Sequence, residues 1–288
     1  MTVGENTCTM EIDRDFAAAL VDGFSGAQKS IPCRFLYDAA GSALFEEITE
    51  LPEYYPTRTE IEILRARAPE IAREVEPGTV LIEFGSGSSI KTELLLAEMP
   101  DLYAYVPIDI SSAALREAHA RIAQCFPALR VLPLCADFSK PLAMPPEIEG
   151  RPRLGFFPGS TIGNLPEPAA VKLLANMAGI VGPGGRLVIG ADLKKDQRRL
   201  IAAYDDAAGV TAAFNLNLLK HANRVLGADF DVSQFDHLAT YDPGHGRVDL
   251  YLVSQIDQTV NVLSRRFTLA AGEKIHTEHS HKYDIEGF

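Results

Sequence analysis

The stretch Thr79–Lys91, TVLIEFGSGSSIK, constrains the fold of this chain more than any other. Its apolar start is too short for a buried helix and rich in branched residues, which predicts a buried strand. Gly85 and Gly87 follow, and the residues from Ile90 onwards resemble the first turns of a helix. A strand, a glycine turn and a helix N-terminus bring backbone N–H groups and the positive end of a helix dipole together. Such places bind nucleotides and nucleotide-like cofactors.

The surrounding sequence predicts an α/β protein with a doubly wound parallel sheet. Helical segments separate five expected strands, which are Thr79–Phe84, Leu102–Ile110, Arg130–Cys135, Leu154–Phe157 and Arg186–Asp192. We expect a domain over 61–195 that carries the glycine turn.

The remaining residues, 11–60 and 196–286, predict a second, mixed α+β domain. Lys195–Leu226 is expected to be helical almost throughout, and we place a helix N-cap at Ser42. An antiparallel meander is expected after that, with strands at Phe235–Tyr241, Arg247–Asp257, Thr259–Leu269 and Lys274–Tyr283.

Composition excludes several kinds of partner. A net charge of −12 over 288 residues would repel nucleic acid. No apolar run approaches the roughly 20 residues that a membrane helix needs, and the N-terminus lacks the features of a signal peptide. The four cysteines form no CxxC pair and are interpreted as reduced thiols. We therefore expect a cytoplasmic protein, monomeric, that acts on a small molecule.

Acidic residues accompany three consecutive strands, at Glu83, Asp109 and Asp137. In an open α/β sheet, ligands bind outside the carboxyl ends of the strands. Asp109 is placed to accept hydrogen bonds from ribose hydroxyls, and Asp137 with Phe138 could hold an adenine. Each acid alone is more often a helix cap or a solvated loop residue, but three on consecutive strands favour a site.

Acidic walls favour a nucleoside that carries a cation, such as S-adenosylmethionine. NAD would bring a pyrophosphate beside Glu83, and Ile90 is too bulky for the third small residue of a dinucleotide fingerprint. A nicotinamide-dependent dehydrogenase is therefore the weaker interpretation.

Several blocks of the chain resemble the histidine-specific methyltransferases of ergothioneine biosynthesis. The resemblance covers residues 30–285, and the two most specific blocks are LPEYYPTRTE from Leu51 and PGSTIGN from Pro158. Further blocks are YDAAGS from Tyr37, EFGSGSS from Glu83 and TEHS from Thr277. The resemblance implies the class I methyltransferase fold, S-adenosylmethionine as methyl donor, and three methylations of the histidine α-amine to give hercynine.

The resemblance also implies roles for individual residues. The residues implied to contact S-adenosylmethionine are Tyr37, Gly85, Lys91, Asp109, Asp137 and Phe138. Those implied to hold the amino-acid backbone of histidine are Tyr54, Gly159, Asn164 and Tyr204, of which Tyr54, Asn164 and Tyr204 would orient the reacting amine. Glu278 and Ser280 would recognise the imidazole.

The last pair also has support in the pattern of the strand. Residues two apart share a strand face, so Glu278 and Ser280 point one way and His279 and His281 the other. A carboxylate beside a hydroxyl can satisfy both imidazole nitrogens, although a salt-bridged exposed strand gives the same pattern. No further cysteine or acid of suitable spacing completes a metal site with His276 and its neighbours, so we predict no metal.

Two alternatives remain, together with one departure from the family. The chain could methylate another amino acid or an aromatic amine, or it could bind S-adenosylmethionine without turnover. The family is expected to continue past Phe288 with a helix and two further strands, so we expect the strand at Arg186–Asp192 to form an edge of the sheet.

Overall fold

The computed structural model describes residues 3–87 and 90–288 of the chain. Ser88 and Ser89 of the glycine turn lie outside the described residues. The fold consists of two compact units. We call Pro56–Ala191 the parallel-sheet unit, and Met1–Tyr55 together with Asp192–Phe288 the mixed-sheet unit.

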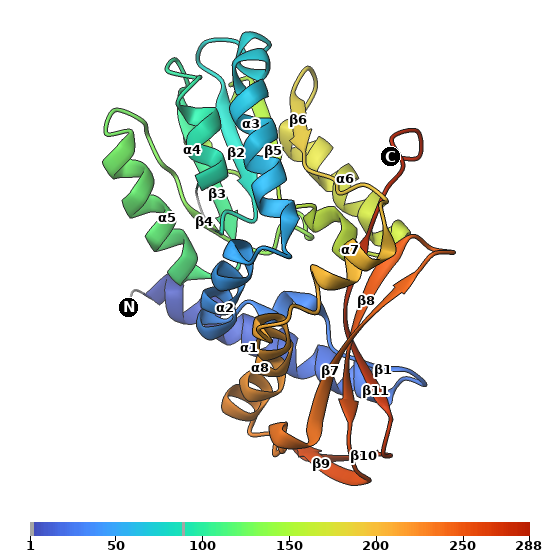
Figure 1. The fold of residues 1–288 in the computed structure, drawn as a ribbon. Coiled ribbons are helices and arrows are strands. Elements are labelled where there is room, and N and C mark those ends of the chain that lie inside the picture. Colours follow the sequence, from blue (N-terminus) through green and yellow to red (C-terminus); the bar gives the residue numbers. More distant parts are fainter. Residues whose placement is uncertain (1–2, 88–89) are drawn as a thin grey trace. The chain divides into compact units, whose positions relative to one another are not determined.

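The parallel-sheet unit is built on five parallel strands in the order β4-β3-β2-β5-β6, which confirms the predicted doubly wound sheet (Figure 1). The strands are β2 Val80–Phe84, β3 Ala104–Asp109, β4 Leu134–Cys135, β5 Arg153–Phe157 and β6 Arg186–Ile189. The helices are α3 Tyr55–Arg73, α4 Ile90–Leu96, α5 Ser112–Cys125 and α6 Glu167–Val181, with 3-10 turns η2 Pro146–Ile148 and η3 Thr161–Asn164.

Strand β4 is much shorter than the expected strand Arg130–Cys135. Val131 still forms a single parallel bridge with Tyr105 of β3. Pro133 follows, and it has no N–H to donate to the ladder, so regular pairing resumes only at Leu134. The sheet ends at β6 on its other side, within the described residues, as expected for an edge strand.

Helices cover both faces of the parallel sheet. On one face, Leu81 and Tyr105 are fully buried in a core that also includes residues of α3, α4 and α5. On the other face, a Cβ added to Gly155 of β5 would lie 3.0 Å from the side chain of Val181 at the end of α6. A glycine is therefore needed where helix and strand approach this closely.

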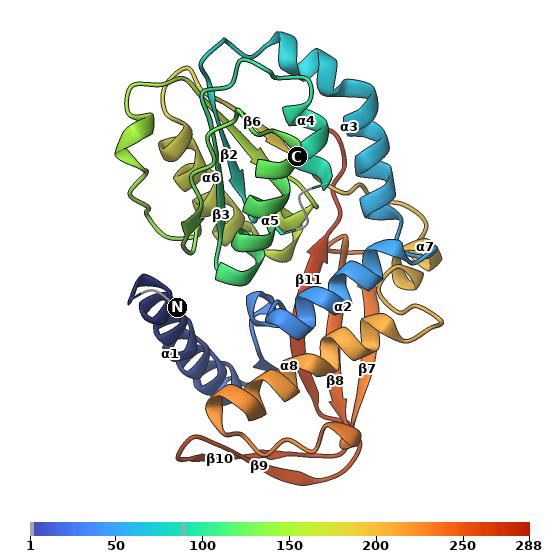
Figure 2. The ribbon, with the colours of Figure 1, turned by 90° about the vertical axis from the view of Figure 1, so that its left-hand side faces the viewer.

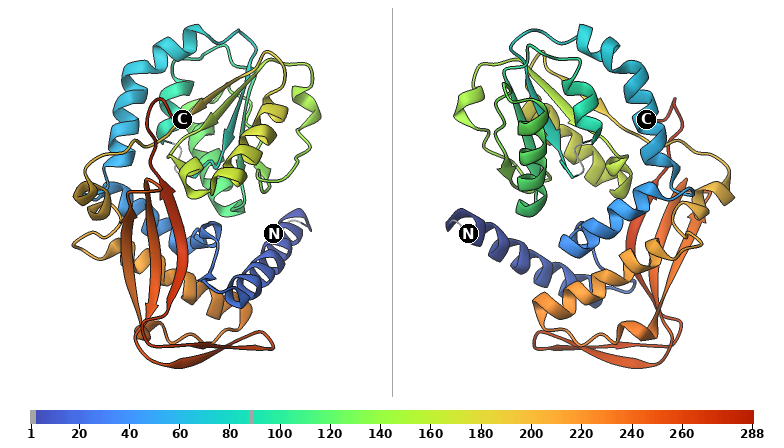
Figure 3. Two further views of the ribbon diagram at one scale, coloured as in Figure 1. Left: turned by 90° about the vertical axis from the view of Figure 1, so that its right-hand side faces the viewer. Right: turned by 60° about the vertical axis from the view of Figure 1, so that its left-hand side comes forward.

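The mixed-sheet unit holds a four-stranded sheet in the order β1-β11-β8-β7. Figure 3 shows its long strands in orange and red. Its strands are β1 Lys29–Ser30, β7 Phe235–Asp242, β8 Arg247–Ser254 and β11 Lys274–His281, with a separate hairpin of β9 Gln258–Val262 and β10 Arg265–Leu269. The helices are α1 Val3–Ser25, α2 Ala39–Glu50, α7 Gln197–Ala202 and α8 Val210–Leu226, with 3-10 turns η1 Cys33–Leu36 and η4 Val232–Gln234. Helix α8 packs on β7 and β8, and α2 lies beside α8 (Figure 2).

Three details of this unit differ from the predictions. The strand expected at Thr259–Leu269 is a hairpin that turns at Leu263, whose φ is +54°, and β11 pairs with β8 rather than continuing a meander. The helix expected over Lys195–Leu226 is broken between α7 and α8. There the carboxylate of Asp206 accepts hydrogen bonds from the first N–H groups of α8, which restarts the helix.

The N-cap of α2 also differs from the one expected at Ser42. Asp38 takes this role, and its carboxylate accepts a hydrogen bond of 2.8 Å from the N–H of Gly41. Arg224 and Asn217 of α8 also donate to Asp38. Burial alone would raise the pKa of Asp38, but these hydrogen bonds outweigh it and hold the pKa below its ordinary value.

The cysteines do not all match the expectation of reduced thiols. Cys33 and Cys125 are free, whereas Cys135 is disulfide-bonded, so the expectation is wrong at Cys135.

Among the described residues, every helix is too short or too polar to cross a bilayer.

We predict that Gly41→Ala destabilises the mixed-sheet unit. A Cβ at this position would lie 1.7 Å from the backbone oxygen of Leu36, so the chain before α2 would have to move. The free energy of unfolding should fall by about 3 kcal/mol or more. Denaturant unfolding measures this change.

Gly179→Ala is the matched control for this substitution. Gly179 is an exposed helical glycine, and an added Cβ would meet nothing within 4 Å. This variant should gain about 0.4–1 kcal/mol because alanine lowers the entropy of the unfolded chain. Equal effects of the two substitutions would contradict the close contact at Gly41.

Candidate functional site

The carboxyl ends of β2 and β3 meet at one edge of the parallel sheet. Gly85 follows β2 with φ of +78°, and its N–H donates a hydrogen bond of 2.8 Å to the carbonyl of Ile108 in β3. A Cβ built on Gly85 would lie 3.7 Å from the ring of Phe138. The glycine turn and the predicted adenine-stacking ring are therefore neighbours.

Asp109, the last residue of β3, and Asp137, which follows β4, lie at the same edge. The carboxylate of Asp109 accepts a hydrogen bond of 2.8 Å from the N–H of Ser111, but burial raises its pKa to about 6. Asp137 accepts from the N–H and hydroxyl of Ser139, at 2.9 and 2.6 Å. Burial would raise the pKa of Asp137, yet these bonds and nearby Lys140 outweigh it and lower the pKa. Both side chains still have oxygens able to accept a bond from a ligand.

Glu60 links Lys91 to the loop after β5. The Lys91 Nζ forms an ion pair of 2.6 Å with Glu60 of α3. The Glu60 carboxylate also accepts from the N–H of Gly159, at 2.9 and 3.0 Å to its two oxygens. Gly159 has φ of +81°, and Asn164 ends the 3-10 turn that follows it. Glu60 thus fixes a backbone turn that holds two of the predicted substrate residues.

Glu83 does not line the site in the way the sequence suggested. Its side chain is only 2% exposed, and both oxygens accept hydrogen bonds, from Thr92 of α4 at 2.7 Å and from the Tyr105 hydroxyl. Burial raises its pKa to about 7, and the two hydrogen bonds oppose that rise. Glu83 therefore fastens the N-terminal turn of α4 to the sheet.

In the mixed-sheet unit, two predicted residues from distant parts of the chain touch directly. The hydroxyls of Tyr204 and Ser280 are 2.7 Å apart. Lys282 donates to both of them, at 2.8 Å each, and its side chain is fully buried. Tyr204, Ser280 and Lys282 therefore form one hydrogen-bonded triangle.

A buried carboxylate balances the charge of Lys282. Asp192 lies 3.0 Å from the Lys282 Nζ and accepts a hydrogen bond of 2.5 Å from the Tyr55 hydroxyl and one of 2.5 Å from Lys195. Burial lowers the pKa of Lys282, opposed by Asp192. Burial would raise the pKa of Asp192, but its cationic partners outweigh this and lower it. Because of these contacts, both Lys282 and Asp192 stay charged inside the unit.

Glu278 lies among aromatic hydroxyls in the same unit. Its side chain is buried. Burial is the main cause that raises the pKa values of Tyr37 and Tyr204, and the negative charge of Glu278 raises both further. The ring of Tyr54 lies 6.1 Å from that of Tyr204, edge to face. The charge of one buried carboxylate thus acts on tyrosines of two different segments.

The predicted residues therefore form two groups. The parallel-sheet unit holds Gly85, Lys91, Asp109, Asp137, Phe138, Gly159 and Asn164. The mixed-sheet unit holds Tyr37, Tyr54, Tyr204, Glu278 and Ser280. Tyr37, which the resemblance implies as a cofactor contact, belongs to the second group.

Sequence reasoning missed the residues that support these groups. Lys282 directly follows the end of β11 and continues the alternation of Glu278 and Ser280, so the period of two could have revealed it. Asp192 and Tyr55 are more than a hundred residues apart and carry no motif that links them. Only the tertiary structure brings them together.

A parallel sheet in this order, with a glycine turn after its first strand and an acid at the end of its second, defines a class I methyltransferase fold. The model of one family, described as "Histidine-specific methyltransferase, SAM-dependent", matches residues 16–288. The chain belongs to this family of S-adenosylmethionine-dependent methyltransferases.

Named relatives agree with the family. A Histidine N-alpha-methyltransferase of Mycolicibacterium smegmatis is 45% identical over 269 residues, which cover 92% of this chain and 83% of that protein. One of the same name from Mycobacterium tuberculosis is 40% identical, over 98% of this chain and 87% of that protein. A 4-dimethylallyltryptophan N-methyltransferase of Claviceps purpurea is 25% identical, over 93% of this chain and 85% of that protein.

The carboxyl edge of the parallel sheet fits the methyl donor of this family. Ser86, directly after Gly85, is fully buried, and its Oγ has no hydrogen-bond partner among the described atoms. Buried hydroxyls without partners are rare in folded proteins. A ligand with polar groups at the glycine turn would satisfy this hydroxyl.

We predict that Glu83 makes stability fall with rising pH. The pKa of Glu83 is about 7 in the folded protein, against about 4.3 in an unfolded chain. Between these values the folded state binds more protons, so this contribution is complete below about pH 4.5 and is lost by about pH 7. The stability difference between the protein and Glu83→Gln should shift by about 3 kcal/mol across this window.

Denaturant unfolding at a series of pH values measures this difference. Glu98→Gln, at an exposed position of the same unit, should show no such shift. A difference between the protein and Glu83→Gln that stays constant with pH would contradict the prediction.

Proposed function

We propose that this chain transfers three methyl groups from S-adenosylmethionine to the α-amino nitrogen of L-histidine and forms hercynine, a step of ergothioneine biosynthesis. The observation that carries the proposal is the buried Glu278 together with the hydrogen-bonded triangle of Tyr204, Ser280 and Lys282, in a chain of the histidine-specific family.

The number of hydroxyl protons in the triangle that remain free to donate supports an imidazole as ligand. Lys282 donates to both hydroxyls, and one hydroxyl donates to the other, so a single hydroxyl proton remains. If Tyr204 donates to Ser280, Ser280 can donate to a ligand while Glu278 accepts. A neutral imidazole offers one acceptor and one donor nitrogen, which matches this pair.

For the methyl donor, we propose the group at the parallel sheet. Asp109 would accept from the ribose hydroxyls, Asp137 from the adenine amine, and Phe138 would stack on the ring. Gly85 and Ser86 would meet the amino-acid part. When bound, the donor would supply a methyl group attached to a sulfonium sulfur. After transfer of the methyl group, the rest of the donor is a neutral thioether.

We assign the orientation of the amine to Tyr54, Asn164 and Tyr204, with Gly159 holding the turn before Asn164. The attacking nitrogen must be neutral, so the α-ammonium group of free histidine must first lose a proton, which solvent can accept. Each of the first two transfers forms an N–C bond and then releases one proton from nitrogen. The third leaves a permanent cation, which aromatic faces such as that of Tyr54 would stabilise.

A second candidate is N-methylation of a larger aromatic amino acid. The similarity to the 4-dimethylallyltryptophan N-methyltransferase favours this candidate. Against it, an indole ring offers an N–H donor for Glu278 but no acceptor for the remaining hydroxyl proton of the triangle, whereas a neutral imidazole offers both. That the protein is a monomer and acts in the cytoplasm stays a prediction. That it binds no nucleic acid also stays a prediction, supported by the net charge of −12.

The test of the function is mass spectrometry of products. Purified protein is incubated with S-adenosylmethionine and each of the twenty amino acids in turn. We expect the mass of three added methyl groups on histidine alone, and none on Nα-acetylhistidine, whose amine is blocked. Product on tryptophan but not on histidine would overturn the proposal in favour of the second candidate.

We predict that Glu278→Ala weakens histidine binding selectively. Losing a charge-assisted hydrogen bond costs about 1.5–3 kcal/mol, so the KM for histidine should rise about 10- to 100-fold. The KM for S-adenosylmethionine should change less than about threefold. Steady-state kinetics with each substrate varied measures both, and Glu286→Ala, at an exposed position of the same unit, is the control. Equal increases in the two constants would rule out imidazole recognition by Glu278.

A further inference from the structure

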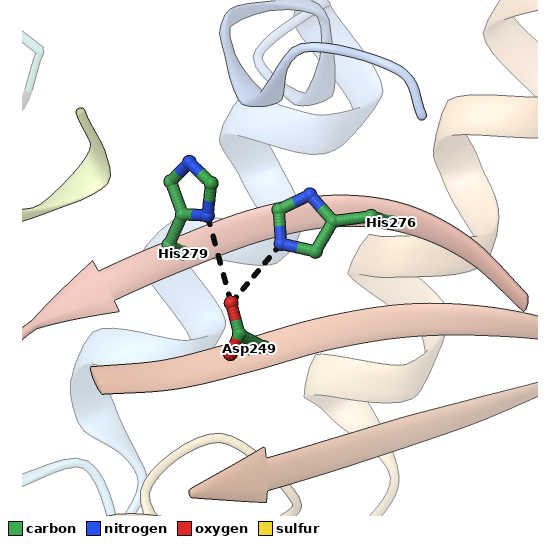
Figure 4. A group of neighbouring side chains, drawn as sticks. All are labelled: Asp249, His276 and His279. Carbon is green, nitrogen blue, oxygen red and sulfur yellow. Dashed lines mark hydrogen bonds and ion pairs between the residues drawn. The ribbon is translucent and has the colours of Figure 1, made fainter. Parts of the chain in front are cut away.

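A second polar cluster lies in the mixed-sheet unit, apart from the triangle. We call Asp249, His276 and His279 the His–Asp cluster (Figure 4). Asp249 comes from β8 and both histidines from β11, and one ligand atom from each lies within 4.8 Å of the others. The Oδ1 atom of Asp249 is 3.2 Å from His276 Nε2 and 3.5 Å from His279 Nδ1.

An irregularity in β11 creates this cluster. Positions 276 and 279 are an odd number apart and would face opposite sides of a regular strand. The pairing of β11 with β8 shifts between His276 and Glu278, so His279 pairs with Asp249 while His276 pairs with Tyr251. The two imidazole rings consequently lie on one face, with centroids 4.5 Å apart. Such bulges redirect side chains and often lie beside functional sites.

The carboxylate at the centre of the cluster is held in place. The Asp249 side chain is 5% exposed, and its other oxygen, Oδ2, accepts a hydrogen bond of 2.9 Å from Arg247 Nε. Arg247 orients Asp249 and leaves Oδ1 directed at both imidazoles.

One atom of the cluster lacks the partner that burial calls for. His279 Nδ1 is buried, and its contact with Asp249 at 3.5 Å does not have hydrogen-bond geometry. Both histidine side chains nevertheless remain partly open, at 16% and 22% exposure. The cluster therefore combines an unsatisfied buried nitrogen with access from solvent.

We propose that Asp249 Oδ1, His276 Nε2 and His279 Nδ1 bind a divalent transition-metal ion, with Zn²⁺ as the best match. Tetrahedral Zn²⁺ with ligand bonds of about 2.0–2.1 Å has ligand atoms about 3.3 Å apart. Two of the three separations, 3.2 and 3.5 Å, lie close to that value, and all three ligand atoms lie within 4.8 Å of one another. Two imidazoles and one carboxylate suit Zn²⁺, Co²⁺ and Ni²⁺ better than Ca²⁺ or Mg²⁺. Water would complete the coordination.

The acid that completes this site was not visible along the chain. The histidines lie within one short segment, but Asp249 precedes His276 by 27 residues and belongs to the neighbouring strand. An ion here would join β8 to β11 on the face of β11 opposite Ser280, and would therefore stabilise the strand that carries Glu278. The proposal does not depend on the methyl-transfer reaction.

The test is a Co²⁺ titration of the tag-free protein after its metals have been removed with a chelator. We expect one Co²⁺ per chain, with the visible absorption of a low-coordinate Co²⁺ ion, and displacement of that signal by Zn²⁺. Zn²⁺ should also raise the melting temperature. His276→Ala and His279→Ala should each weaken binding by at least about 100-fold.

His245→Ala is the matched control, because His245 is an exposed histidine that also pairs with an acid, Asp242, at 2.6 Å. It should bind Co²⁺ as the unaltered protein does. Asp249→Asn keeps the shape of the site and serves if an alanine variant fails to fold, as judged by circular dichroism. No Co²⁺ absorption in the unaltered protein, or equal binding by Asp249→Asn, would overturn the proposal and leave a simple imidazole–carboxylate ion-pair cluster.

Discussion

The irregular pairing of β11 with β8 decides which side chains of this strand work together. From Glu278 onwards the strand alternates regularly, so Glu278, Ser280 and Lys282 share the face that also meets Tyr204. The shift before Glu278 brings His276 to the other face, beside His279. A regular strand would have divided the residues differently, because a change of one residue moves every following side chain to the opposite face.

Buried charge imposes a second constraint on the mixed-sheet unit. Lys282 has no exposed side-chain surface, and an isolated ammonium group would lose its proton there. Asp192 supplies the opposite charge, and the hydroxyl of Tyr55 and the ammonium of Lys195 satisfy the remaining carboxylate positions. Removing one member of such a set leaves an uncompensated charge, which typically costs about 3–5 kcal/mol. The set thus holds the hydroxyls of Tyr204 and Ser280 in one arrangement.

The parallel-sheet unit solves a related problem with a carboxyl group whose pKa is raised. Glu83 lies in the central strand of the sheet, two residues before Gly85, and accepts hydrogen bonds from Thr92 and Tyr105. Its burial makes proton loss unfavourable, whereas Asp137 at the sheet edge keeps a lowered pKa through bonds from Ser139. Two acids of similar position in the sequence pattern therefore do different work, one in structure and one at the ligand edge.

The sequence by itself determined the parallel sheet, the glycine turn at Gly85 and the family, because strands, turns and motif blocks are local patterns. It also indicated Glu278 with Ser280 from the period of two. Only the tertiary structure decided that Glu83 turns inward, that Asp38 rather than Ser42 caps α2, and that Asp249 and Asp192 meet partners on β11. These outcomes depend on strand register and on contacts between distant segments, and the free energy of burying a charge depends on which partners the completed fold supplies.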